Sequence, residues 1–116
     1  MRLSNNLLED YAGLKVAEAI LLNKVMRTVH IANNKLSSEV AEKYAEVITN
    51  NKNMKDLDLS NNLFIMDELS TLAQAFKESN LEILNLRGNV VSAEEIGAFE
   101  DMLSTVANMP RRKFLF

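Results

Sequence analysis

Apolar residues along the chain follow two spacings. Short segments place them at every second position, as in Leu57-Asp-Leu59 and Leu84-Asn-Leu86, which is typical of strands with one buried face. Longer segments place them three and four residues apart, which is the period of an amphipathic helix. We expect four helices, whose buried faces are formed by Tyr11, Leu14, Ala17, Ile20 and Leu21; by Val40, Tyr44, Val47 and Ile48; by Leu69, Leu72, Ala73 and Phe76; and by Ile96, Phe99, Met102, Leu103 and Val106. The alternation of strands and helices predicts an α/β fold.

Two of the helix starts are marked by local residues. Ser92 is followed three residues later by Glu95, the arrangement of a capping box in which each side chain bonds the other residue's backbone N–H. The acidic segment Met66-Asp67-Glu68 indicates the start of the third helix.

Strands and helices recur with one period, which is marked by asparagine. The markers are Asn5-Asn6, Asn33-Asn34, Asn61-Asn62 and Gly88-Asn89. Their spacings are 28, 28 and 27 residues. Three full copies of the pattern L-x-x-L-x-L-x-x-N-x-L begin at Met26, Met54 and Leu81, and a truncated copy lies at the N-terminus. We divide a single domain, 1–116, into repeats of about 1–25, 26–53, 54–80 and 81–108, with a partial fifth strand in 109–116.

This pattern resembles that of leucine-rich repeats. The period, with a helix in each unit, resembles the ribonuclease-inhibitor-like subfamily, and the resemblance covers nearly the whole chain. It implies a short right-handed solenoid, with a parallel sheet on the concave side, helices on the convex side and protein partners as ligands. Cytoskeletal capping proteins such as tropomodulin and activators of small GTPases carry similar repeats, and nothing in this sequence selects either.

The asparagines have a physical role in such a repeat. An asparagine side chain has both a carbonyl and an amide group, so one that turns inward can bond backbone groups that a tight bend leaves unpaired. We therefore expect a structural ladder of Asn6, Asn34, Asn62 and Asn89. The preceding Asn5, Asn33 and Asn61, with Gly88 in the last copy, are expected to be exposed at the turn in unusual backbone conformations. Of the 14 asparagines, six more are expected near helix ends: Asn23, Asn50, Asn51, Asn53, Asn80 and Asn108.

Composition excludes several kinds of chemistry. The chain has no Cys and a single histidine, His30, which excludes a disulfide framework, a Cys-ligated zinc site, an iron–sulfur cluster and a multi-histidine metal site. Three glycines are too few for a Gly-rich phosphate loop. We expect a non-enzymatic protein with no cofactor and no metal. Because the sequence also lacks a signal peptide and an 18-residue apolar stretch, we expect a cytoplasmic location and no membrane insertion.

Charge indicates a protein partner. The net charge of −3 argues against nucleic acid. Between Asp67 and Asp101 the chain has eight acids and two bases, a balance of −6 that could steer a basic partner.

The candidate binding residues are the outward positions of the strands, which form columns with one residue per repeat. One column is Arg2, His30, Asp58 and Asn85, and the next is Ser4, Ala32, Ser60 and Arg87. Positions just before the strands add Arg27, Lys55, Asp56 and Glu82. No aromatic residue, the usual anchor of a tight interface, occurs in these columns.

The segment Met109–Phe116 resembles a fifth strand of uncertain register. Either Phe114 and Phe116 face the core, or Leu115 does. An open strand edge formed by Phe114, Leu115 and Phe116 could pair with another copy, giving a homo-oligomer; alternatively, the chain is a fragment of a longer repeat protein. The leading functional hypothesis is an interaction module within a larger intracellular protein. The alternatives are a regulator of an enzyme or small GTPase, and a structural assembly or capping unit.

Overall fold

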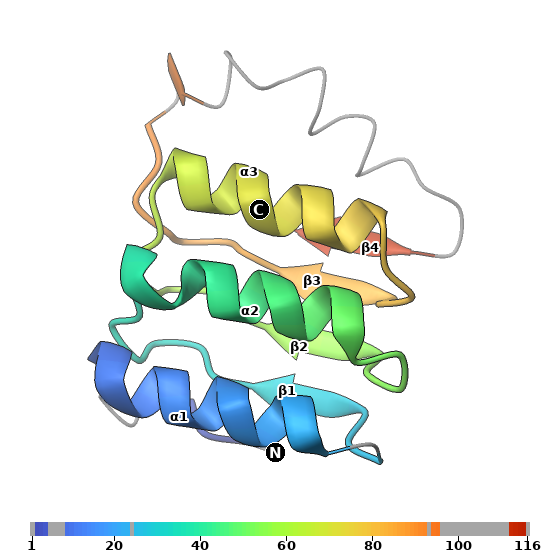
Figure 1. Cartoon of the computed structure of the whole chain (residues 1–116). Helices are drawn as coiled ribbons and strands as arrows, with labels where there is room; N and C mark the ends of the chain where they lie inside the picture. The colour runs from blue at the N-terminus through green and yellow to red at the C-terminus, as the bar shows by residue number, and fades with distance from the viewer. Residues whose placement is uncertain (1, 5–8, 24, 93, 96–111, 116) are drawn as a thin grey trace.

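A computed structural model describes residues 2–4, 9–23, 25–92, 94–95 and 112–115 (Figure 1). Within these residues lie three helices and four strands, in the order α1 (Glu9–Leu22), β1 (Thr28–His30), α2 (Ser38–Asn50), β2 (Asp56–Asp58), α3 (Met66–Lys77), β3 (Ile83–Asn85) and β4 (Lys113–Leu115). The fourth helix predicted over 96–106 lies outside the described residues, as do Asn5, Asn6, Asn108 and Phe116.

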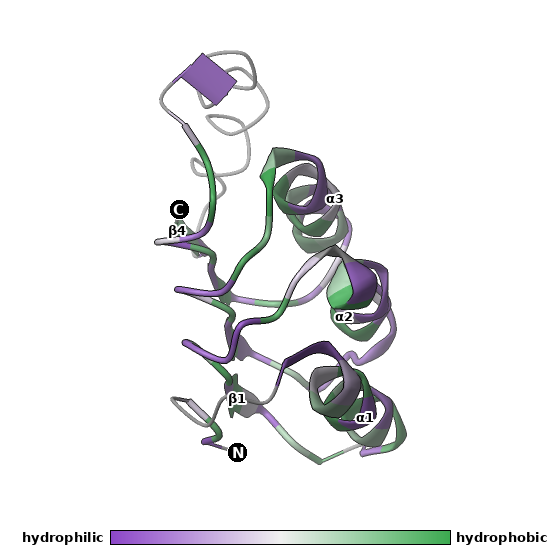
Figure 2. Cartoon of the chain, turned by 90° about the vertical axis from the view of Figure 1, so that its left-hand side faces the viewer, coloured by the Kyte–Doolittle hydropathy of each residue, from purple (hydrophilic) through white to green (hydrophobic). Residues whose placement is uncertain are grey.

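The strands form one sheet in the order β1-β2-β3-β4, and each neighbouring pair is parallel. Beyond β1, Arg2 forms an isolated parallel bridge with His30, and the Leu3 N–H donates to the His30 carbonyl at 2.7 Å. All three helices cover the same face of the sheet, as the side view shows (Figure 2). The predicted α/β class and parallel sheet are confirmed.

The core lies between the sheet and the helix layer. The middle residue of every strand points into it, and the register aligns these residues into one buried row: Val29, Leu57, Leu84 and Phe114. A second buried row, two residues later, consists of Ile31, Leu59 and Leu86. Each fully buried aliphatic side chain stabilises the fold by about 1.5–3 kcal/mol, so these rows hold the strands against the helices.

The first helix departs from its predicted face at one residue, since Ala17 and Ile20 are buried and Leu14 and Leu21 pack against the core. Tyr11 was expected in the core, but it is 78% exposed, and the Lys15 ammonium lies 5.7 Å from its ring centroid. The buried residues of α1 are Gly13, Ala17 and Ile20. A Cβ atom on Gly13 would lie 2.4 Å from a methyl group of Leu36, so the glycine allows the close approach. At 100° per residue, Tyr11 then lies about 160° from Gly13 and faces outward.

Asn62 joins two successive turns of the chain. Its amide donates to the carbonyls of Ile31 and Leu59, at 3.2 and 3.0 Å. Its side-chain oxygen accepts from the backbone N–H groups of Asn34, at 2.9 Å, and Leu36, at 3.1 Å. Asn62 is 3% exposed, so these bonds satisfy backbone groups that water does not reach.

The equivalent asparagines make equivalent bonds. The Asn34 amide donates to the Leu3 carbonyl at 2.8 Å, and the Asn89 amide donates to the Leu59 carbonyl at 3.2 Å. The Asn89 oxygen accepts from the Phe64 N–H at 3.1 Å. Each of these bonds crosses from one strand–helix unit to its neighbour, so the asparagines tie consecutive units together.

The residue before each of these asparagines has a positive φ. The values are 63° at Asn33, 54° at Asn61 and 74° at Gly88, and all three residues are exposed. This is the unusual backbone conformation that the sequence predicts at these turns, where asparagine and glycine are tolerated best. Lys35 also has a positive φ, of 58°, which no local sequence feature predicts.

The ends of the helices carry a second set of polar links that the sequence did not indicate. Asn51 follows α2 and is buried, and its amide donates to the carbonyls of Ile20 and Asn23, both at 3.1 Å. Asn51 therefore does more than end a helix, because it also connects α2 to the end of α1.

Arg112 makes the corresponding link between β4 and the end of α3. Its Nε donates to the Leu81 carbonyl at 2.8 Å, and Nη2 donates to the Phe76 carbonyl and to the Ser79 hydroxyl. The guanidinium lies 4.0 Å from the centroid of the Phe76 ring. Burial lowers the pKa of Arg112 below its ordinary value. Because the ordinary pKa of an arginine is far above 7, the guanidinium remains charged at neutral pH.

Reciprocal bonds at the last described turn match the predicted capping box. The Ser92 N–H donates to the Glu95 carboxylate and the Glu95 N–H donates to the Ser92 hydroxyl, both at 3.2 Å. In α3, which starts at Met66 as predicted, Glu68 accepts from the Ile65 N–H at 3.3 Å.

Candidate interaction surface

The face of the sheet opposite the helices (Figure 2) is called the open sheet face. Its first row runs across the strands as Thr28, Asp56, Ile83 and Lys113, and its second row as Arg2, His30, Asp58, Asn85 and Leu115. The structure thus brings together the first predicted column and adds Leu115 to it. The helices described cover the other face, so these rows are accessible to a partner.

Several residues of the predicted columns accept hydrogen bonds from backbone N–H groups of other residues. Asp58 accepts from the N–H and the hydroxyl of Ser60, at 2.9 and 2.6 Å. Asn85 accepts from the N–H of Arg87 at 3.1 Å, and Ser4 accepts from the N–H of Ala32 at 3.0 Å. These bonds satisfy donors where the chain leaves the sheet, so Ser4, Asp58 and Asn85 stabilise the strand ends.

Ser60 differs from its expected position. It was predicted to project outward with Arg87, but it is only 6% exposed. Its hydroxyl donates to Asp58 at 2.6 Å, and its carbonyl accepts from the Asn62 amide at 3.3 Å. In the second predicted column, Ser4 and Ala32 are half-buried and Ser60 is buried, so Arg87 is its exposed residue.

His30 and Asp56 form the one ion pair on this face among the described residues. Their Nε2 and Oδ2 atoms are 3.4 Å apart, and both side chains are about 30% exposed. The pair connects β1 to β2 diagonally, because His30 is level with Asp58 rather than with Asp56. At this length and exposure it contributes little to stability, so both groups stay available to a partner.

The half of the face formed by β3 and β4 has a different character. Its outward residues are Ile83 and Asn85 on β3 and Lys113 and Leu115 on β4, with Arg87 directly after β3. Arg87 also donates from its Nε to the Asn85 oxygen at 3.2 Å, which holds the guanidinium on this face. This half therefore combines two aliphatic side chains with two cations.

The register of β4 decides between the two alternatives left by the sequence. Phe114 is level with Leu84 and 6% exposed, and its ring centroid is 5.7 Å from that of Phe76. Leu115 is half-buried on the open sheet face. The Phe114 side chain thus belongs to the core.

Charge is distributed unevenly between the two layers. The helices α1, α2 and α3 contain eight acidic and three basic residues, a balance of −5. The described residues outside these three helices include eight basic and six acidic residues, a balance of +2. A charged partner would therefore be oriented by the field of the molecule as it approaches.

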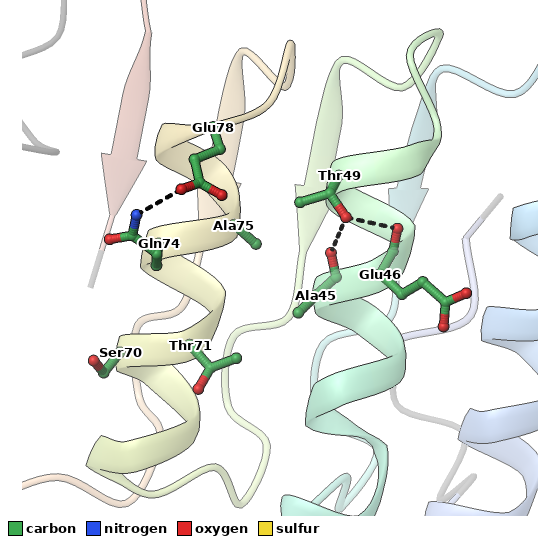
Figure 3. A pocket seen from close by; sticks show the side chains of 8 residues that line it. All are labelled: Ala45, Glu46, Thr49, Ser70, Thr71, Gln74, Ala75 and Glu78. Carbon is green, nitrogen blue, oxygen red and sulfur yellow. Dashed lines mark hydrogen bonds between the residues drawn. The ribbon is translucent and has the colours of Figure 1, made fainter.

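A groove of about 560 Å³ lies between α2 and α3 in the acidic layer (Figure 3). Small side chains such as Ala45 and Ala75 line it, with Glu46 and Glu78 at its borders. Its polar groups bond within their own helices: the Gln74 amide, for instance, donates to Glu78 at 2.9 Å (Figure 3). The groove thus adds to the negative charge of the helix layer without presenting a group held for a ligand.

The titratable residues described on this face do not meet the requirements of a metal site. No three His, Asp or Glu side chains among the described residues are placed to hold a metal ion. Beside His30 stand two carboxylates, Asp56 and Asp58, and a basic residue, Arg2. None of the described helices is long and apolar enough to cross a membrane.

Comparison with known proteins identifies a fold and no family. No protein-family model matches the chain, and no curated protein sequence matches it. Among solved structures, it is similar to one entitled "Leiomodin-1 Actin-Binding Site 2 (ABS2)", with a TM-score of 0.78. The similarity covers 100% of this chain and 69% of that chain, at 16% sequence identity. At that identity the likeness establishes the fold alone.

Proposed function

We propose that this chain is a non-enzymatic protein–protein interaction module, built as a short solenoid of ribonuclease-inhibitor-like leucine-rich repeats. The observation that carries the proposal is the open sheet face, on which the register fixes two rows of mostly polar side chains. The repeated Asn62-type bonds support the repeat assignment, because each one joins a unit to the next at the same position.

A face of this kind is suited to binding because its side chains are already ordered. Asp58 and Asn85 are held by the strand ends, and Asn85 in turn holds Arg87. Ordering side chains on association costs about 0.5–1.5 kcal/mol each, and a surface with ordered side chains avoids part of this cost. An enzyme inhibitor or a GTPase activator would use the same face. These roles are therefore distinguished by which partner binds, not by where on the chain it binds.

Actin is the first partner that we would test. The similar solved structure is entitled an actin-binding site, and a sequence without cysteine is consistent with the cytoplasmic setting that such a partner requires. Co-sedimentation with actin filaments tests this partner directly. A negative result removes actin and leaves the interaction module to be tested with other proteins.

The general test compares two double variants in pulldowns from an extract of the native cells. His30→Ala with Arg87→Ala removes two side chains from the open sheet face. Lys15→Ala with Lys77→Ala removes two exposed cations from the helix layer. We expect a defined partner to be lost with the first variant and retained with the second, with both variants folded by circular dichroism. Equal retention in both variants would reject the open sheet face as the binding surface.

A further inference from the structure

We propose that the β3–β4 half of the open sheet face binds an acidic, extended segment of the partner, in which two carboxylates flank an aliphatic side chain. This inference rests on the proposed function and specifies the chemistry of the partner. It is carried by the placement of Arg87 and Lys113 at the two ends of this half, with Leu115 at the level between them and Ile83 beside Lys113.

Arg87 is held ready for a carboxylate. The side-chain oxygen of Asn85 accepts from the backbone N–H of Arg87, at 3.1 Å, and from the Arg87 Nε, at 3.2 Å. The guanidinium is thus anchored at one nitrogen. Its two terminal nitrogens have no partner among the described residues and keep four N–H donors. A guanidinium with free terminal donors and restricted motion favours bidentate bonding to a carboxylate.

Lys113 supplies the second cation at the other end of the strand pair. It is exposed, it is level with Ile83, and in the part of the chain that the structure describes it has no ion pair. Its ammonium is therefore available as a point charge for a second carboxylate. Leu115 lies one level further along, between the two cations, and Ile83 lies beside Lys113; both are half-buried and present aliphatic surface.

The spacing sets the pattern of the segment. Ile83 is level with Lys113, and Arg87 lies four residues beyond Ile83. In an extended chain, the Cα atoms of residues four apart are separated by about 13 Å, at 3.3 Å per residue. An extended peptide covers the same distance in four residues and directs every second side chain to the same side. The complementary sequence is acid, any residue, aliphatic, any residue, acid.

Charge elsewhere on the molecule favours this placement. Asp56 and Asp58 on β2 are level with Ile83 and Asn85, so an acidic segment that moved sideways toward β2 would meet like charge. Glu82, just before β3, would repel a segment that extended past Lys113. The helix layer, at −5, repels it from the opposite side of the molecule. Like-charge contacts of this kind suppress alternative binding positions.

The test is a chemical-shift titration of the isotope-labelled chain with a nine-residue peptide centred on Glu, Thr, Leu, Thr and Glu. We expect the largest amide shifts at residues 83–87 and 113–115, weaker binding at higher salt, and no shifts with a peptide in which Lys replaces both Glu. Arg87→Ala should weaken binding about tenfold or more, and Arg87→Lys should recover it only in part. Lys52→Ala, which removes an exposed cation from the loop after α2, serves as the matched control and should bind as the wild type does.

The inference is overturned by equal binding of the Lys peptide, by shifts centred elsewhere, by the absence of shifts at millimolar peptide, or by unchanged binding of a folded Arg87→Ala variant. The dispersion of each variant's spectrum shows whether it is folded. If the peptide fails while the partner pulldown still depends on His30 and Arg87, the acidic segment is wrong and the interaction module stands. If the pulldown is also independent of the open sheet face, both fall.

Discussion

Replacing Asn62 by alanine removes the side chain that joins two consecutive units of the fold. Two backbone N–H groups, those of Asn34 and Leu36, lose their acceptor, and both are buried. Alanine has no group that could replace it, and the site is closed to water, since Asn62 is 3% exposed.

The expected loss of stability follows from those two donors. An unsatisfied buried donor costs about 1–3 kcal/mol, so two cost about 2–6 kcal/mol, and we expect about 4 kcal/mol. That is a large part of the roughly 5–15 kcal/mol by which domains of this size are stable. With a urea m-value of about 2 kcal/mol per molar, the unfolding midpoint should fall by about 2 M.

Urea unfolding followed by circular dichroism measures this change. Asn50→Ala is the matched control, because Asn50 is exposed and its amide bonds only within its own helix. We expect it to alter stability by about 0.5 kcal/mol or less. A loss below about 1 kcal/mol for Asn62→Ala, or equal losses for the two variants, would show that the inter-unit bonds do not hold the strand–helix units together.

Three further substitutions test other contacts. Arg112→Ala should lower the free energy of unfolding in urea by about 2–3 kcal/mol, because carbonyls at the end of α3 lose their donors and the Phe76 ring loses its cover. If Arg112→Lys were as stable as the wild type, the planar, multiply bonding shape of the guanidinium would have no role. Gly13→Ala should lower the thermal unfolding midpoint, because the added Cβ would clash with Leu36, although alanine favours helix more than glycine does. A raised midpoint would show that α1 does not pack this closely against Leu36. Burial raises the pKa of Tyr44, whose hydroxyl donates to the Gly13 carbonyl at 2.8 Å, so the unfolded state ionises first above pH about 10 and stability falls there as pH rises. Tyr44→Phe should cost about 1 kcal/mol at neutral pH and lose less stability between pH 10 and 11, and parallel pH profiles for the two proteins would contradict this.

The regular parts of the fold were predictable because they depend on local spacing. Apolar alternation predicts β2 and β3, and the asparagine period predicts the turns at Asn33, Asn61 and Gly88, whose positive φ values follow from residue type. The predicted and observed start of α3 agree for the same reason, since acidic residues favour the first turn of a helix.

What escaped prediction depends on contacts between units. Spacing placed Tyr11 on the buried face of α1, and the other residues of that face do contact the core, but Tyr11 is exposed because the helix packs closely at Gly13. The links made by the Asn51 amide likewise join it to Ile20 and Asn23 of the preceding unit rather than to its own segment.

The candidate site was predicted as columns of outward residues, and the structure adds Leu115 of β4 to the first column. The sequence placed Arg2, His30, Asp58 and Asn85 together, and the register agrees. It could not show that Asp58 and Asn85 also serve the strand ends, nor that β4 adds Lys113 and Leu115, because the register of that strand was open.

The central claim is that partners bind the open sheet face rather than the helix layer, and site-specific photocrosslinking tests it most directly. One protein carries a photoreactive amino acid at Thr28, which is exposed in the first row of that face, and the other carries it at Gln74, which is exposed on α3. In an extract of the native cells, the account predicts a defined protein adduct from position 28 and none from position 74. An adduct formed only from position 74, or equally from both positions, would contradict it.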